Sequence, residues 1–408
     1  MSFRKILFWM HLVAGCVAGA IVLIMSFTGV LLTYERQMLA KADRGPYRSA
    51  TASAGAHRLT VDELVAKLQE TPGTLPRNAS LVLRKDAAEP VEIQAGRGGG
   101  VYVSPYDGRV LGRGNTGMHE TFQKITAWHR WLATEGEGRA TARTITGASN
   151  FAFLFIVLSG IYLWLPKLWT KRHLRPITWF KGGLSGKARD FNWHNVFGIW
   201  MAIPLAIIVA TGLPMSYRWA NDLLYKMTGS EIPVPAGPGG RGPGGGGPGG
   251  GGRPERVART AGRAMTPITP LLQNVQERVP DWKSISVRIP ERPNADVVFA
   301  VDTGDGGQPQ KRSTLTLDPG TGSVKKAETF DSTSAGRRLR SWSRFAHTGE
   351  YYGIVGQTIA GLASLAGVML VWTGISRALR RLAAWRGRNK TKPAPRETSA
   401  GRADRVAV

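Results

Sequence analysis

The sequence predicts an α-helical membrane protein, in which a tandem repeat builds a four-helix transmembrane bundle with two small α+β domains outside the membrane. Two observations predict this fold class. Four apolar runs are each about 20 residues long, enough to cross a hydrocarbon core of ~30 Å. The first and third runs share one layout, because His11 and His194 are each followed 17 positions later by a Thr-Gly pair. The four runs are Phe8–Thr33, Ile145–Leu165, Val196–Tyr217 and Ile354–Ile375.

The first run begins after Arg4 and Lys5, as a secretory signal peptide would. It is too long for the apolar core of a signal peptide, and no small-residue cleavage site follows it closely. We therefore expect residues 1–34 to remain as the first membrane helix. The single cysteine, Cys16, lies in this run, so no disulfide framework is available, and its simplest role is apolar packing.

The net charge of +26 is distributed as in a membrane protein. From Lys167 to Arg189 there are seven Lys/Arg and no acid, and from Arg377 to the end there are ten Lys/Arg and two acids. The two other connections are long and contain many Asp and Glu. This positive-inside pattern places both termini in the cytoplasm and both long loops outside. It argues against a nucleic-acid-binding protein, and the basic tail is suited to anionic lipid headgroups.

Each long outer loop is expected to hold one small domain, over residues 56–112 and 264–331. In the first, Thr60 and Glu63 form a capping box ahead of a helical stretch. Alternating apolar segments then predict strands. The second loop repeats this order of helix, strands and turn.

Linkers and helices occupy the rest of the chain. Lys41 to Gly55 is expected to be a linker. The Gly/Pro-rich insertion over residues 236–254 is expected to be disordered, because its composition cannot bury a core. The remaining segments are an interfacial helix with membrane helix 2 (119–166), a basic loop (167–192), membrane helix 3 (193–218), membrane helix 4 (340–376) and a basic tail (377–408).

A Ser/Thr-Gly pair closes every predicted span. Small residues of this kind let helix backbones approach closely, so helix packing is the simplest interpretation of the pairs. They are Thr28-Gly29, Ser159-Gly160, Thr211-Gly212 and Thr373-Gly374.

Four histidines follow the repeat. His11 and His194 are expected at the same depth in the membrane, near the inner ends of helices 1 and 3. His129 and His347 lie just before helices 2 and 4, near the outer surface. The outer two are less regular, since His129 precedes Ser159 by 30 positions and His347 precedes Thr373 by 26. A histidine in an apolar span is costly unless it is satisfied, so it indicates function.

Two histidines on two helices at one level can supply both axial ligands of a haem iron. Hydrogen-bonded packing, a proton relay or a metal site are the alternatives. Zinc and copper sites usually recruit Cys, Asp or Glu as well, and helices 1, 2 and 4 contain no acid between their ends. The residues therefore favour haem. Of the other histidines, His57 and His173 are expected on the surface, and His119 is a weaker candidate for touching a cofactor or substrate.

These motifs, in this order, resemble the PepSY-associated transmembrane proteins of bacterial inner membranes, over residues 3 to 380. The matching motifs are Trp9-Met-His11 with Thr28-Gly29, Trp128-His129-Arg-Trp-Leu132, Gly160-Ile-Tyr-Leu-Trp-Leu-Pro166, Trp193-His194-Asn-Val-Phe-Gly198 with Thr211-Gly212, and Ala346-His347-Thr-Gly349 with Trp372-Thr-Gly374.

The resemblance implies periplasmic PepSY-like domains and two b-type haems ligated by His11, His194, His129 and His347. It also implies electron transfer from the cytoplasmic side, with quinol or a flavoprotein as donor, to a ferric siderophore or other ferric chelate in the periplasm. No nucleophile or general base is expected. The alternatives are an electron-transfer subunit for another periplasmic reductase and a PepSY protein that binds or regulates without catalysis.

Overall fold

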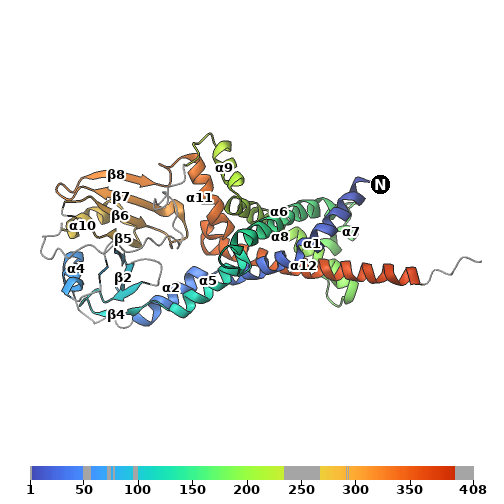
Figure 1. The fold of residues 1–408 in the computed structure, drawn as a ribbon, viewed down its shortest axis with the longest axis horizontal. Coiled ribbons are helices and arrows are strands. Elements are labelled where there is room, and N and C mark those ends of the chain that lie inside the picture. Colours follow the sequence, from blue (N-terminus) through green and yellow to red (C-terminus); the bar gives the residue numbers. More distant parts are fainter. Residues whose placement is uncertain are drawn as a thin grey trace, which may run out of the picture.

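A bundle of long helices forms one end of the molecule and an antiparallel sheet forms the other (Figure 1). The computed structural model describes residues 2–48, 57–70, 75–76, 79–94, 100–233, 267–290, 292 and 294–390. The Gly/Pro-rich insertion over residues 236–254 lies outside these residues. The first residues and the C-terminal end of the last described helix lie at the end of the bundle away from the sheet (Figure 1). We call this the sheet-distal end, and the opposite end of the bundle the sheet-proximal end.

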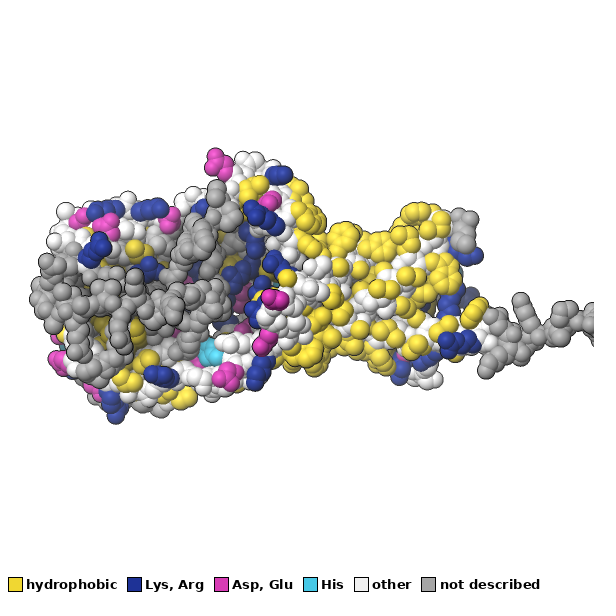
Figure 2. All heavy atoms as spheres, viewed as in Figure 1, with side chains coloured by type: hydrophobic (Ala, Val, Ile, Leu, Met, Phe, Trp, Pro, Cys, Tyr) yellow, Lys and Arg dark blue, Asp and Glu magenta, His cyan; other side chains and the backbone are white. Residues whose placement is uncertain are grey.

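Among the residues that the structure describes, four helices are long and apolar enough to cross a membrane. α1 packs against α6 and α12, and α8 packs against the same two helices, so α1 and α8 face each other diagonally. Apolar side chains cover much of the face of the bundle that Figure 2 shows, as contact with lipid requires. The four helices are α1 (Phe3–Leu32), α6 (Gly138–Trp164), α8 (Gly186–Ser216) and α12 (Gly353–Lys390).

Glycines bring α1 and α12 together. A Cβ at Gly361 would lie 2.9 Å from the Thr33 side chain, and one at Gly367 would lie 2.7 Å from Ser26 Oγ. Neither position has room for a larger residue at this helix spacing. Inside the bundle, one buried apolar cluster includes Phe153 of α6 and Leu205 of α8.

Shorter helices connect the bundle to the sheet. α12 runs on to Lys390, so the first part of the predicted basic tail is helical. The linker predicted from Lys41 was wrong at its start, because α2 continues to Arg44 and a short 3-10 helix follows. The Asp43 carboxylate of α2 accepts from the backbone N–H of Asn115, the N-cap of α5, and contacts His119 of α5, which orders this segment. The connecting helices are α2 (Glu35–Arg44), η1 (Gly45–Tyr47), α5 (Thr116–Trp131), α9 (Arg218–Met227) and α11 (Ala335–His347). A further helix, α7 (Lys171–Thr178), lies in the basic loop.

The sheet has eight antiparallel strands in the order β4-β3-β2-β1-β5-β6-β7-β8. Its first half follows α4 (Val61–Glu70) and its second follows α10 (Thr269–Arg278), so each predicted outer segment contains a helix and four strands. The strands are β1 (Ser80–Arg84), β2 (Val91–Gln94), β3 (Val101–Val103), β4 (Val110–Arg113), β5 (Ser284–Arg288), β6 (Val297–Asp302), β7 (Arg312–Leu317) and β8 (Val324–Thr329).

The two halves share one hydrophobic core. β1 pairs with β5, with Leu81 opposite Val287 and Leu83 opposite Ile285, and all four side chains belong to a single buried cluster that extends under both α4 and α10. Two small domains were expected from the sequence, and the structure joins the two units edge to edge. The pairing covers an edge strand that each half would otherwise expose.

Candidate haem-binding sites

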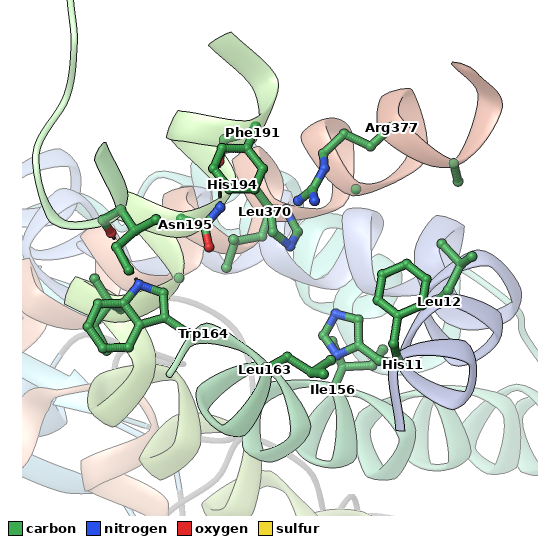
Figure 3. Close-up of a pocket in the computed structure, with 18 of the residues that line it drawn as sticks. His11, Leu12, Ile156, Leu163, Trp164, Phe191, His194, Asn195, Leu370 and Arg377 are labelled. Atoms are coloured by element: carbon green, nitrogen blue, oxygen red, sulfur yellow. Dashed lines mark hydrogen bonds between the residues drawn. The ribbon is translucent and has the colours of Figure 1, made fainter. Parts of the chain in front are cut away.

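The four histidines predicted from the sequence form two pairs at opposite ends of the bundle. His11 of α1 and His194 of α8 line one cavity of about 1620 Å³ at the sheet-distal end (Figure 3). His129 of α5 and His347 of α11 meet at the sheet-proximal end, where their ring centres are 6.4 Å apart. The four-residue difference in spacing therefore does not prevent the second pair from meeting.

Each histidine is held by a Ser/Thr-Gly pair from another helix. At the sheet-distal end, His11 Nδ1 lies 2.9 Å from Ser159 Oγ, and His194 Nδ1 lies 2.9 Å from Thr373 Oγ1. The glycine that follows each hydroxyl residue lies beneath the ring. A Cβ at Gly160 would be 3.4 Å from His11 Cε1, and one at Gly374 would be 3.5 Å from His194 Cε1.

The sheet-proximal pair follows the same scheme. His129 Nδ1 lies 2.9 Å from Thr28 Oγ1. His347 Nδ1 lies 3.4 Å from Thr211 Oγ1 and 2.7 Å from the Ile208 carbonyl oxygen. Gly29 lies against His129 and Gly212 against His347, with Cβ-to-Cε1 distances of 3.7 and 3.3 Å. Sequence reasoning interpreted these pairs as helix packing and missed their contact with histidine, because each pair is far from its histidine in the chain.

These contacts determine which imidazole nitrogen carries the proton. The Thr28 hydroxyl donates its one hydrogen to the Ile24 carbonyl 2.6 Å away, so its oxygen is left to accept from His129 Nδ1–H. The Thr373 hydroxyl likewise donates to the Met369 carbonyl at 2.7 Å. For His347 the main partner is itself a carbonyl, which can only accept. In a neutral imidazole, Nε2 then keeps its lone pair and is available to a metal.

The sheet-proximal histidines are kept neutral by their surroundings. Burial, together with the neighbouring His347, lowers the pKa of His129 to about 4. Burial also lowers the pKa of His347. A neutral imidazole is the form that binds a metal ion, so protonation does not compete with binding near pH 7.

The separation of the sheet-proximal rings would suit two imidazoles that hold one metal ion between them. A histidine nitrogen lies about 2.0 Å from a bound metal and about 1 Å from its ring centre, so two such imidazoles have ring centres roughly 6 Å apart. The His129–His347 separation of 6.4 Å matches this. Among the described residues there is no group of three or more His, Cys, Asp or Glu that could hold a bare ion. A haem would bring its own nitrogen ligands to such a histidine pair.

The other histidines are separate from these pairs. His57 is exposed. His173 of α7 is also exposed, at the mouth of the sheet-distal cavity, where Nδ1 lies 2.7 Å from Thr170 Oγ1. His119 Nε2 lies 2.8 Å from Asp43 Oδ2, so its described contact is structural. Cys16, predicted to be apolar packing, lines the sheet-distal cavity.

Comparison with known proteins identifies the family. No curated protein matches the chain. Residues 8–381 match the profile of the family described as the PepSY-associated TM region, a range that includes most of α1 and α12, all of α6 and α8, and both histidine pairs. The chain therefore belongs to the PepSY-associated transmembrane family.

Proposed function

We propose that this protein carries electrons across a bacterial inner membrane through two haem b groups, one held by His11 and His194 and the other by His129 and His347. The observation that carries the proposal is the repeated contact of each histidine with a Ser/Thr-Gly pair, which directs every Nε2 away from the helix that anchors it. Four histidines with unrelated packing roles would not be expected to make the same contact with a Ser/Thr-Gly pair.

The chain's own residues prepare both sites. The hydroxyl oxygens of Ser159, Thr28 and Thr373 accept a hydrogen bond from the histidine Nδ1–H, and the apolar helices exclude water. Haem supplies reversible one-electron chemistry when bound. Along α1, His11 and the Thr28 that holds His129 are separated by about 25 Å at 1.5 Å per residue. The two sites therefore divide the membrane barrier between them.

The direction and partners follow from the charge pattern and the family. Both termini would lie in the cytoplasm and the sheet in the periplasm, as the positive-inside rule predicts. Quinol or a cytoplasmic flavoprotein would be the donor at the sheet-distal site, and a ferric siderophore or another ferric chelate the acceptor beyond the sheet-proximal site. One electron reduces the chelated Fe(III) to Fe(II).

Haem content tests the proposal directly. The purified protein is expected to show a b-type spectrum with about two haems per chain after dithionite reduction. His11→Ala and the double variant His11→Ala/His194→Ala should both leave one haem, because they affect one site. His11→Ala/His129→Ala should leave none. His57→Ala is the control and should leave both.

Several outcomes would contradict this function. A colourless protein from haem-replete cells would rule out both sites. One remaining haem in His11→Ala/His129→Ala would show that the histidines are paired differently. If the reduced protein is reoxidised by no ferric chelate, the protein transfers electrons to a different periplasmic acceptor.

A further inference from the structure

The sheet-distal cavity combines an apolar interior with a cationic mouth. Leu12, Phe153 and Leu205 lie among its apolar residues, and seven Lys and Arg side chains also line it. No Asp or Glu is among the described residues that line it. Such a cavity fits an amphiphilic anion that is apolar on one side and negatively charged on the other.

Most of the arginines here already have protein partners. Arg4 donates to the carbonyls of Leu163 and Leu165 at 2.8 and 2.9 Å. Arg380 pairs with Asp190 at 3.0 Å. Arg381 lies over the rings of Phe8 and Trp9.

Arg377 differs from Arg4 and Arg380 in its partners, and from the exposed Arg381 in its burial. It is partly buried and lines the cavity together with His11 and His194 (Figure 3). Its guanidinium lies 5.3 Å from the Phe191 ring centre. Among the residues that the structure describes, none forms a hydrogen bond or ion pair with it.

The nearest acid cannot serve as the partner of Arg377. Asp190 is fully buried, and its charge acts on Arg377 only at a distance. Its Oδ1 accepts from Arg189, while its Oδ2 accepts from Ser376 at 2.7 Å and pairs with Arg380. Both carboxylate oxygens are therefore occupied. A cation in an apolar cavity is costly without a counter-ion.

We propose that Arg377 binds a carboxylate of the porphyrin in the sheet-distal site, so that the porphyrin sits with its carboxylates toward the Lys/Arg mouth. This rests on the proposed haem function. The planar guanidinium matches a carboxylate with two parallel hydrogen bonds. The same pairing orients the ring, because the apolar edge must then point toward the bundle interior.

Haem release from the full-length holoprotein tests the role of Arg377. Arg377→Gln removes the charge, and haem should leave the sheet-distal site at least about tenfold faster, since breaking a buried charge pair leaves one charge unpaired. Arg377→Lys keeps the charge but cannot form the two parallel hydrogen bonds of a guanidinium, so its rate of haem release should lie between those of wild type and Arg377→Gln. Arg386→Gln is the matched control, because Arg386 is also on α12 but is exposed and does not line the cavity. The sheet-proximal haem should be unaffected and reports that each variant is folded.

A second measurement identifies the anion. The haem-free protein is reconstituted with haem or with its dimethyl ester, which lacks the charged carboxylates. Wild type should bind the ester at least about tenfold more weakly at the sheet-distal site, and Arg377→Gln should discriminate between haem and ester clearly less than wild type, because one of the two carboxylates has lost its partner. If Arg377→Gln discriminates between them as strongly as wild type does, Arg377 binds neither carboxylate and the proposal is wrong. It is also wrong if the variant keeps haem normally but loses affinity for vesicles that contain phosphatidylglycerol, because the anion is then a lipid phosphate. A wild-type protein without haem would instead refute the proposed function itself.

Discussion

At the residue scale, a threonine hydroxyl has one hydrogen and can direct it to only one partner. In Thr28, Thr211 and Thr373 this hydrogen goes to a carbonyl one turn earlier in the same helix, at 2.6 to 2.7 Å. The oxygen is then an obligate acceptor for any neighbour. Opposite each is a histidine, whose Nδ1 must donate and whose Nε2 must be unprotonated. A common helix interaction thus determines the tautomer of a residue far away in the chain.

Thr373→Val removes the acceptor from His194 while keeping the shape of the side chain. We expect the affinity of the sheet-distal site for haem to fall by about 10- to 100-fold, as is typical when the partner of a metal-ligating histidine is lost. Nitrogen NMR of the haem-free protein should show His194 as a mixture of tautomers. Thr373→Ser should restore one tautomer.

Thr144→Val is the control for that experiment. The Thr144 hydroxyl also bonds a carbonyl in its own helix, that of Ala140 at 3.2 Å, but it is exposed. This variant should leave His194 and the haem affinity unchanged. An unchanged tautomer in Thr373→Val would show that the hydroxyl does not position the ring.

At the element scale, α4 and α10 cap each other across the two halves of the sheet. The Asp62 carboxylate accepts from the backbone N–H groups of Ile268 and Thr269 at 2.7 and 2.9 Å. In return, the Thr269 hydroxyl accepts from the Asp62 backbone at 3.4 Å. The predicted capping box is also present, because Thr60 N donates to Glu63 at 2.8 Å. One carboxylate therefore serves a helix that lies about 200 residues away in the chain.

Asp62→Ala should weaken the joined sheet. Loss of an N-terminal cap costs about 0.5–2 kcal/mol, so the amides of β1 and β5 should exchange hydrogen faster in the intact protein. Asp281→Ala, at an exposed position after α10, should have no such effect. If the β1 and β5 amides exchange no faster in Asp62→Ala than in wild type, the cap does not stabilise the sheet against local opening.

At the scale of the whole molecule, one sheet connects the two halves of the chain. The halves meet at the β1–β5 seam above a bundle in which each half also supplies two spanning helices. Each histidine pair takes one histidine from each half. Separating the halves would therefore break the sheet and both sites together, which couples the fold of the outer part to that of the bundle.

A cross-link tests the seam. Val82 and Ser286 are partners across β1 and β5. With Cys16→Ser as the background, Val82→Cys and Ser286→Cys should form a disulfide on mild oxidation, because Cβ atoms of facing residues are about 5 Å apart. Peptide mass spectrometry detects the link. Val82→Cys with Thr314→Cys is the control and should not link, since three strand spacings of about 4.8 Å separate those positions. Linking in the control alone would contradict this strand order.

Apolar length, alternation and matched spacing are local properties, so the amino-acid sequence alone predicts the spanning helices, the helix-and-strand order of the outer segments and the four histidines that form the two pairs. The tertiary structure decided what these elements touch. The β1–β5 seam, the hydroxyls beneath Nδ1, the mutual cap at Asp62 and the uncommitted Arg377 all join residues far apart in the chain. Spacing along one helix gives the depth of His11 or His194, but only the packing of the helices determines which residue meets each of them there.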